Sequence, residues 1–433
     1  MKSFLLNNYH NHKETIHNFG WRALQIVGKQ GINFGIFVLC IKLLNLHDFG
    51  IYNYILAIIF LLIMFGDFGI STATSKYIAE YNAVDKEKLK MVVFNSGLMI
   101  LILTIMVTFL TITIGPLYLK EKYIYVLWLL PLIFLAPMTS LYDGIYRGLN
   151  KFKELAIVSL FVGSISIFII YFLIKSYGLI GALLAQNIFY LILLLGLIFG
   201  HQEFKMIINR KIINEIGRYS FLIGLSGVGY FLYSRISTLM LGHYGYITEI
   251  SYYELLNKFF VFLIIPFSIL GEVIAPKNTR LYALKKIILL KQKFIKYFVI
   301  SIIMGILVSI IFWYLLPMIV SIYLPQYDTS ILKEFLKIQI FIFFILVSTA
   351  TINNGIITPT NYTKWIMISS IFFGVLNFPM SMVLHYYLSY NGIILSSLIT
   401  YILNTSSVYL IYYKTTFKET ENEKNLHTLR NEA

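Results

Sequence analysis

Four basic residues lie inside long apolar stretches of the sequence. Arg22 and Lys29 are seven residues apart, Arg235 lies in a later stretch, and Lys258 lies in the stretch after that. A charge at the bilayer centre costs roughly 2.5–3.5 kcal/mol on insertion scales, so each should face a cavity or a partner. Because the planar guanidinium binds phosphate oxygens bidentately, the four residues predict a wet, cationic cavity for an anionic ligand such as a pyrophosphate.

Some of these residues also have a simpler interpretation. The side chain of Arg22 could extend to the membrane surface on its aliphatic stem. Lys258 could be satisfied by Glu254, which precedes it by the four residues that favour a helical ion pair. Lys29 and Arg235 lie deeper in their stretches, so a cavity is the favoured interpretation for them.

Four carboxylates are candidates for carrying a coupling proton or holding Na⁺: Asp67, Asp143, Glu254 and Glu272. A carboxylate buried in a transport protein can bind and release a cation in this way. A structural role is the alternative. Asp67 and Glu272 could pair with Lys or Arg of nearby loops, and Asp143 has the i,i+4 spacing that pairs it with Arg147.

Motifs for enzymatic chemistry are missing from the sequence. It contains neither a G-x-x-x-x-G-K-[ST] loop nor an H-E-x-x-H pair,. The one cysteine, Cys40, allows no intrachain disulfide and no cysteine metal site,. We therefore expect no catalytic residues, no metal and no cofactor. A polymerase or ligase of lipid-linked sugars would also need a larger loop outside the membrane than any present here.

The composition is that of a membrane protein. Of the 433 residues, 58% are hydrophobic and only 13% are charged, whereas a soluble domain carries roughly 25% charged residues. A spanning helix needs about 20 mostly apolar residues. Twelve stretches qualify, and they begin near Trp21, Gly50, Lys90, Tyr123, Glu154, Leu179, Ile216, Ser251, Phe294, Leu332, Lys364 and Gly392.

The loop charges predict the orientation. Most of the 35 Lys and Arg residues fall on one side of the predicted helices, and this side should be cytoplasmic. Both termini then lie in the cytoplasm. The net charge of +15 is explained by these short loops, so no nucleic-acid partner is expected. The opposite side carries Lys42, Lys120, Lys122, Lys175, Lys333 and Lys337.

Two short matches, half a chain apart, indicate an internal repeat. Gly66-Asp67 matches Gly271-Glu272, and Gly178-Leu179-Ile180 matches Gly392-Ile393-Ile394. They predict an all-α integral membrane protein of two six-helix bundles, an architecture known among transporters. The expected parts are a first bundle over 1–200, a linker over 201–215, a second bundle over 216–413 and a tail over 414–433.

Three segments resemble the polysaccharide transporter branch of the MOP exporter superfamily, which includes the Wzx-type flippases. FGIYNYILAIIFLLIMFGDFGISTATSKYIAEY (49–81) has a tyrosine-bearing entry, an apolar run and an Asp-x-Gly element at Asp67-Phe68-Gly69. IYRGLNKF (145–152) is similar to an Arg-Gly turn before a basic loop. SRISTLMLGHYGYITEISYYELLNKF (234–259) is similar to the pattern of a basic residue, an apolar run, a glycine loop and a Tyr-bearing helix.

The resemblance implies a MATE-like fold in a bacterial inner membrane and a flippase function. Wzx-type members move undecaprenyl-pyrophosphate-linked oligosaccharide repeat units for O-antigen or capsule assembly, by alternating access that an H⁺ or Na⁺ gradient would drive. By position, Arg22, Lys29, Arg235 and Lys258 would line the central cavity. Membrane lipid and a polysaccharide polymerase complex are the further partners implied.

One departure concerns the residue two positions after Arg235. Many members of the family have an acidic residue there, whereas this chain has Ser237. Either coupling differs in this chain or Arg235 is left free for the substrate. A multidrug or metabolite exporter of the same superfamily is the main alternative function, and it would want an acidic or aromatic pocket. A structural membrane protein would leave the buried charges without explanation.

Overall fold

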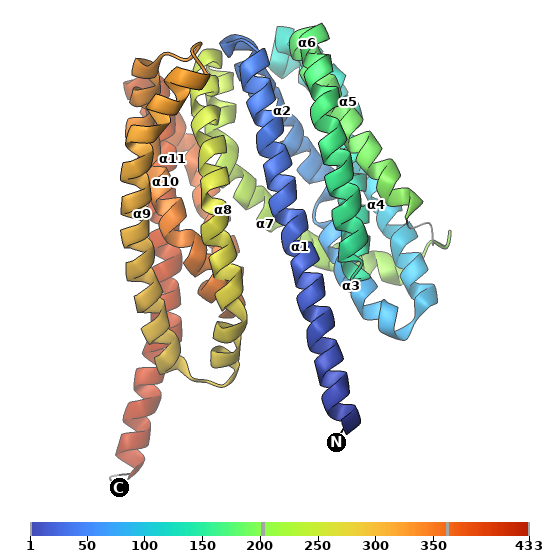
Figure 1. Cartoon of the computed structure of the whole chain (residues 1–433), viewed down its shortest axis with the longest axis vertical. Helices are drawn as coiled ribbons and strands as arrows, with labels where there is room; N and C mark the ends of the chain where they lie inside the picture. Colours follow the sequence, from blue (N-terminus) through green and yellow to red (C-terminus); the bar gives the residue numbers. More distant parts are fainter. Residues whose placement is uncertain (1, 201–203, 361–362, 432–433) are drawn as a thin grey trace. The chain divides into compact units, whose positions relative to one another are not determined.

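The computed structural model describes residues 2–200, 204–360 and 363–431. Side chains are described except for those of 2–19, 22–23, 83, 363 and 417–431. The described residues form helices and no strand (Figure 1). The helices are α1 (Lys2–Leu43), α2 (Leu46–Asp67), α3 (Ile70–Val84), α4 (Lys86–Leu119), η1 (Lys120–Lys122), α5 (Tyr123–Gly148), α6 (Phe152–Phe199), α7 (Arg210–His243), α8 (Ile247–Ala283), α9 (Ile287–Tyr323), α10 (Thr329–Ile352), η2 (Asn353–Ile357), η3 (Thr358–Thr360) and α11 (Thr363–Asn431).

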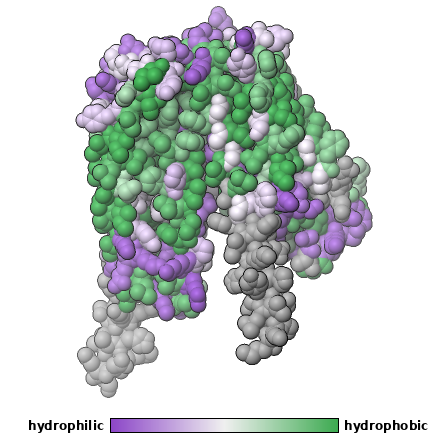
Figure 2. Space-filling view, in the orientation of Figure 1, coloured by the Kyte–Doolittle hydropathy of each residue, from purple (hydrophilic) through white to green (hydrophobic). Residues whose placement is uncertain are grey.

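Most of the helices turn apolar side chains outward, as lipid requires. Phe109 and Phe168 are 65% and 68% exposed, while polar residues such as Thr74 and Asn95 are fully buried. Figure 2 shows apolar residues over the middle of the surface and hydrophilic residues toward its ends. Eight described segments are long and apolar enough to span a membrane: Leu24–Leu43, Leu46–Asn82, Lys86–Gly148, Phe152–Phe199, Ile247–Ala283, Ile287–Tyr323, Thr329–Thr360 and Lys364–Thr416.

The chain divides into two compact units, Met1–Val228 and Gly229–Ala433. The division falls inside α7. The segment just before α7 belongs to the first unit because α4 holds it: Asn95 Nδ2 donates to the Ile207 carbonyl at 2.9 Å, and Asn209 N donates to Asn95 Oδ1 at 3.0 Å. The predicted bundle boundaries at 200 and 216 stay a prediction.

Two of the long helices are helical hairpins. Gly178 in α6 has φ 55° and ψ −129°, and Ser389 in α11 has φ 52° and ψ −139°. A methyl group on Gly181 would overlap the carbonyl oxygen of Leu173. Eight residues span about 12 Å along a straight helix, so this contact means that the chain folds back on itself.

The second hairpin repeats this geometry with a corrected register. A methyl group on Gly392 would overlap the carbonyl oxygen of Leu384. Gly392 therefore corresponds to Gly181, and Ser389 corresponds to Gly178. The predicted match of Gly178 with Gly392 was shifted by three residues. The close helix approach requires a glycine in both hairpins, whereas the turn itself accepts a serine in the second.

The other predicted match is similar only up to its acidic residue. Gly66 in α2 and Gly271 in α8 each let a neighbouring helix approach, and a Cβ on Gly271 would lie 2.9 Å from the Thr351 carbonyl. The helix α2 ends at Asp67, and the next two residues have positive φ, 38° at Phe68 and 80° at Gly69. After Glu272, however, α8 continues unbroken to Ala283.

Candidate functional site

The second unit holds a charged cluster on α7 and α8. Arg235 Nη1 donates to both carboxylate oxygens of Glu254, at 3.1 Å from Oε1 and 3.0 Å from Oε2. The Thr238 hydroxyl donates to Oε1 at 2.5 Å. The Glu254 side chain is only 1% exposed. The turn between α7 and α8 contains Gly245 at φ 85°. It reverses the chain direction, so that Arg235 of α7 faces Glu254 of α8.

Lys258 belongs to the same cluster. It lies one helical turn after Glu254 on α8, and its charge acts on the Glu254 carboxylate. The predicted helical pair is therefore present as an electrostatic interaction, but Arg235 supplies the hydrogen bonds. Two cations and one carboxylate leave an excess of one positive charge. In a membrane such an excess favours a bound anion or water.

Arg235 is not left free, yet its guanidinium is only partly used. One of its nitrogens, Nη1, serves both Glu254 oxygens, and the side chain is 32% exposed. Among the described residues, Nε and Nη2 have no hydrogen-bond partner. These two atoms form the edge of the guanidinium that binds a phosphate or carboxylate with two parallel hydrogen bonds.

Ser237 does not replace the missing acidic residue. It is 1% exposed and forms a short hydrogen bond with the hydroxyl of Ser397 in α11. Asn377 Nδ2 donates to the same Ser397 hydroxyl at 3.3 Å. Glu254 supplies the carboxylate for Arg235 from α8 instead. Sequence reasoning missed Thr238, although its i,i+3 spacing from Arg235 places both on one helix face.

The first unit holds a second cluster, on α1 and α5. Arg147 Nε lies 2.7 Å from Asp143 Oδ2, which is the i,i+4 pair predicted from the sequence. Gln25 of α1 donates from Nε2 to Asp143 Oδ1 at 3.3 Å. Gln25 is 3% exposed, and its contact with Asp143 joins two helices that are far apart in the sequence.

Asp67 lies at the break between α2 and α3 and holds the start of α3. Its Oδ1 accepts hydrogen bonds from the backbone N and the hydroxyl of Ser71, at 2.9 and 2.5 Å. The charge of Arg147 also acts on Asp67. Ser71 makes the hydrogen bonds of Asp67, and Arg147 of α5 is an electrostatic neighbour without an ion pair to it. The predicted pairing of Asp67 with a basic loop residue stays a prediction. Two carboxylates and one arginine leave this cluster with an excess negative charge.

Close packing of α3 on α5 brings the acidic residues near Arg147. A methyl group on Gly144 would overlap the Ser71 carbonyl oxygen, and a Cβ on Gly148 would lie 2.7 Å from the Ser75 carbonyl. Gly144 and Gly148 form a G-x-x-x-G pair, which lets helix backbones approach in a membrane.

Two further predicted residues, Lys29 and Glu272, take no part in the contacts described above. Lys29 is exposed and follows Gln25 by one turn of α1. Glu272 is exposed on α8. The side chain of Arg22 lies outside the described residues. Of the four predicted cationic residues, the structure therefore brings together Arg235 and Lys258.

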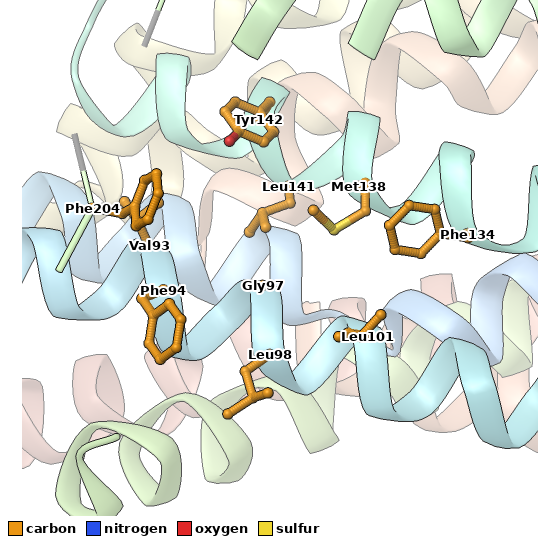
Figure 3. A pocket seen from close by; sticks show the side chains of 10 residues that line it. All are labelled: Val93, Phe94, Gly97, Leu98, Leu101, Phe134, Met138, Leu141, Tyr142 and Phe204. Atoms are coloured by element: carbon orange, nitrogen blue, oxygen red, sulfur yellow. The ribbon is translucent and has the colours of Figure 1, made fainter. Parts of the chain in front are cut away.

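A cavity of about 260 Å³ in the first unit is unsuited to an anion (Figure 3). Its lining is apolar, and the hydroxyl of Tyr142 is the one side-chain polar group on it. Figure 3 shows that α4 and α5 supply most of its walls. The lining residues are Val93, Phe94, Gly97, Leu98, Leu101, Phe134, Met138, Leu141, Tyr142 and Phe204.

Comparisons with known proteins identify related families and folds. A family described as polysaccharide biosynthesis protein matches residues 15–281, which is more than half of the chain. The MatE family matches residues 223–383. The search of curated proteins finds no match.

Solved structures of transporters share the fold. An inward-facing multidrug resistance MATE family transporter of the MOP superfamily matches with a TM-score of 0.69 and 14% identity, over 90% of this chain and 97% of the other. A eukaryotic MATE transporter, AtDTX14, matches with a TM-score of 0.64 and 13% identity, over 95% and 98%. The lipid II flippase MurJ matches with a TM-score of 0.64 and 17% identity, over 92% and 86%.

Proposed function

Because the chain belongs to the polysaccharide biosynthesis protein family within the MATE and MOP transporters, which are transporters rather than enzymes, we propose that it is a flippase for a lipid-linked oligosaccharide. The cargo is an undecaprenyl-pyrophosphate-linked repeat unit of O-antigen or capsule. It moves from the cytoplasmic to the periplasmic leaflet by alternating exposure of one site to the two sides of the membrane.

The unused edge of Arg235 is the observation that carries this proposal. Nε and Nη2 point a two-donor fork out of a cluster that keeps one excess positive charge. A pyrophosphate offers the oxygens that such a fork binds, and its charge offsets the excess. Lys258, one helical turn after Glu254 on α8, adds the second positive charge of this cluster. Arg22 and Lys29 on α1 stay predicted substrate-binding residues. A wet cavity for the cargo would replace the hydration that the sugar loses in hydrocarbon.

The acidic cluster of the first unit suits the coupling ion. Asp67 and Asp143 both lie within the influence of Arg147, so adding a proton or Na⁺ to either carboxylate changes the balance of the whole cluster. Glu254 and Glu272 are the further candidates, and Glu254 would link coupling directly to Arg235. An H⁺ or Na⁺ gradient then drives the transport.

Export of cationic compounds is the second candidate function. The excess negative charge of Asp67, Asp143 and Arg147 is the observation that favours it, because a cationic drug would be attracted to that cluster. The two functions predict opposite charges on the cargo, so one experiment separates them.

The proposed arrangement has twelve spanning helices and two cytoplasmic termini. Three of the eight long segments contain a break, at Lys120–Lys122, Gly178 and Ser389, so each supplies two helices. With α7 the count agrees with the twelve predicted stretches. The proposed location is the bacterial inner membrane, next to a polysaccharide polymerase.

The test is transport of a fluorescent undecaprenyl-pyrophosphate-linked oligosaccharide in proteoliposomes. Wild-type protein should move it across the bilayer. Arg235→Ala and Lys29→Ala should each slow transport at least tenfold, since a lost charge-assisted hydrogen bond is worth about 1.5–3 kcal/mol. Arg235→Lys keeps the charge but loses the fork, so it should fall between wild type and Arg235→Ala.

Arg210→Ala is the matched control, because Arg210 is an exposed arginine on the same helix as Arg235. It should transport at the wild-type rate. If wild-type protein moves cationic dyes but no pyrophosphate-linked cargo, the protein is an exporter of cations and the flippase proposal is wrong. Undiminished transport by both alanine variants would keep the flippase and remove Arg235 and Lys29 from its site.

A further inference from the structure

The hairpin between α8 and α9 concentrates positive charge at one end of the second unit. We call residues 277–296 the basic hairpin. No Asp or Glu occurs in the sequence between Glu272 and Asp328. Figure 1 places this hairpin at the lower end of α8 and α9, and Figure 2 shows hydrophilic residues gathered there. Its basic residues are Lys277, Arg280, Lys285, Lys286, Lys291, Lys293 and Lys296.

The inner face of the basic hairpin is fixed to the rest of the unit. Leu290 and Phe294 are buried in a cluster with Ile356 and Tyr412. Asn278, which is 1% exposed, donates from Nδ2 to the Gly355 carbonyl at 2.8 Å. The hairpin is therefore a packed element with one apolar face, and its cations are left to the outer face.

Four of these seven cations have no acidic partner in the part of the chain that the structure describes. Lys277, Arg280, Lys285 and Lys286 are exposed, and no carboxylate among the described residues lies within ion-pair distance of them. Lys277 and Lys293 are close enough to repel each other. Holding like charges together costs free energy unless an anion offsets them.

Two basic residues near the start of α4, in the first unit, do have acidic partners. Lys205 Nζ lies 2.7 Å from Glu87 Oε2, and Lys88 Nζ lies 3.5 Å from Asp85 Oδ2. Carboxylates thus neutralise these two cations near the start of α4, whereas no carboxylate in the described part of the chain pairs with Lys277, Arg280, Lys285 or Lys286.

Apolar side chains among the cations indicate where the anion comes from. Leu284, Ile288 and Leu289 are 54%, 49% and 47% exposed. A surface that mixes such side chains with Lys and Arg suits the membrane interface, where the apolar groups enter the acyl region. Moreover, α8 has 37 residues, about 55 Å of helix, and so extends beyond a hydrocarbon core of about 30 Å.

We propose that the basic hairpin binds the phosphate headgroups of anionic phospholipids. Each Lys or Arg near an anionic membrane surface contributes about 1 kcal/mol, or about fivefold in affinity. Because the inner face is already packed, the backbone of the basic hairpin loses little conformational entropy when it binds a lipid. This site is separate from Arg235, and it does not depend on what the protein transports.

Native mass spectrometry of the full-length protein tests the site by titration with phosphatidylglycerol and, separately, with zwitterionic phosphatidylcholine. Wild-type protein should bind phosphatidylglycerol more tightly, and added salt should weaken that preference. The triple variant Lys277→Gln, Lys285→Gln, Lys286→Gln should lose about 100-fold in affinity for phosphatidylglycerol, about fivefold for each cation removed.

The matched control is the triple variant Lys277→Arg, Lys285→Arg, Lys286→Arg, which keeps every charge and should bind as wild type does. Circular dichroism of both triple variants checks that the helices are intact, which the exposure of the three side chains leads us to expect. Equal affinity of wild type for the two lipids would overturn the proposal. Unchanged phosphatidylglycerol binding by the glutamine variant would overturn it equally.

Discussion

Arg235 holds both carboxylate oxygens of Glu254 with a single nitrogen. The two Nη1 distances are 3.1 and 3.0 Å, which leaves the Nε and Nη2 edge facing away from the pair. A bidentate fork-to-fork pair would have used that edge. The geometry therefore combines a buried structural ion pair with an available anion-binding group in one side chain.

Replacing Glu254 should destabilise the second unit. Glu254→Gln keeps the size of the side chain but leaves Arg235 and Lys258 without their carboxylate, and breaking a buried pair costs at most about 3–5 kcal/mol. Loss of helical circular dichroism on heating measures the thermal unfolding. Glu272→Gln, an exposed site on the same helix, should unfold like wild type, and equal midpoints for both variants would contradict the importance of the pair.

Asp67 should be required for ion coupling but not for folding. Asp67→Asn removes the negative charge, and its amide oxygen can still accept from the Ser71 backbone N. We expect a folded transporter whose rate no longer responds to a pH or Na⁺ gradient. Transport in proteoliposomes with and without each gradient measures this. Ser71→Ala is the control that keeps the charge, and an unaltered gradient response in Asp67→Asn would exclude Asp67 from coupling.

Gly144 should tolerate no side chain. A methyl group there would meet the Ser71 backbone carbonyl, so α3 would have to move away from α5. Overpacking of this kind costs about 1–3 kcal/mol. Gly97→Ala is the matched control, because its Cβ would meet only Leu141 Cδ2, at 3.8 Å. Thermal unfolding should separate the two variants, and the idea fails if Gly144→Ala is as stable as Gly97→Ala.

The two hairpin turns should respond in opposite directions. The positive φ of Ser389 strains the backbone of a serine but not that of a glycine. Ser389→Gly should therefore raise the free energy of unfolding by about 1 kcal/mol. Gly178→Ala should destabilise it by a similar amount, although no atom lies within 4 Å of its Cβ position. Unfolding midpoints of both variants test the backbone argument, and a shift of the same sign in both would refute it.

Asp328 should contribute stability that depends on pH. Its carboxylate precedes α10 and accepts hydrogen bonds from the Ser330 hydroxyl and backbone N, at 2.6 and 2.7 Å. These bonds lower the pKa of Asp328 below its usual value. The carboxylate therefore binds its proton less readily when folded. The contribution is complete above the ordinary carboxyl pKa and is lost as the pH falls through the lowered one.

The variant Asp328→Ala tests this pH dependence. It should be less stable than wild type at pH 7, and the difference should shrink toward pH 3. Unfolding of both proteins across this range provides the measurement. A difference that stays constant with pH would show that the charge has no part in capping α10.

Local patterns in the sequence determined the class of the protein and its local contacts. Long apolar runs require helices in lipid, because every backbone polar group must be satisfied within the segment. The Asp143–Arg147 pair was also predictable, because the two residues are four positions apart on one helix and therefore lie on the same face. The family resemblance was confirmed by the match over residues 15–281.

Only the tertiary structure decided which distant side chains meet. Sequence spacing pairs Glu254 with Lys258, yet Arg235 approaches from another helix and takes the hydrogen bonds. Gln25 of α1 contacts Asp143 of α5. In the internal repeat, Ser389 of the second hairpin is equivalent to Gly178 of the first. Spacing along a chain reports neighbours within one helix, whereas the partners across helices depend on where glycines let backbones approach and on which turn each helix begins.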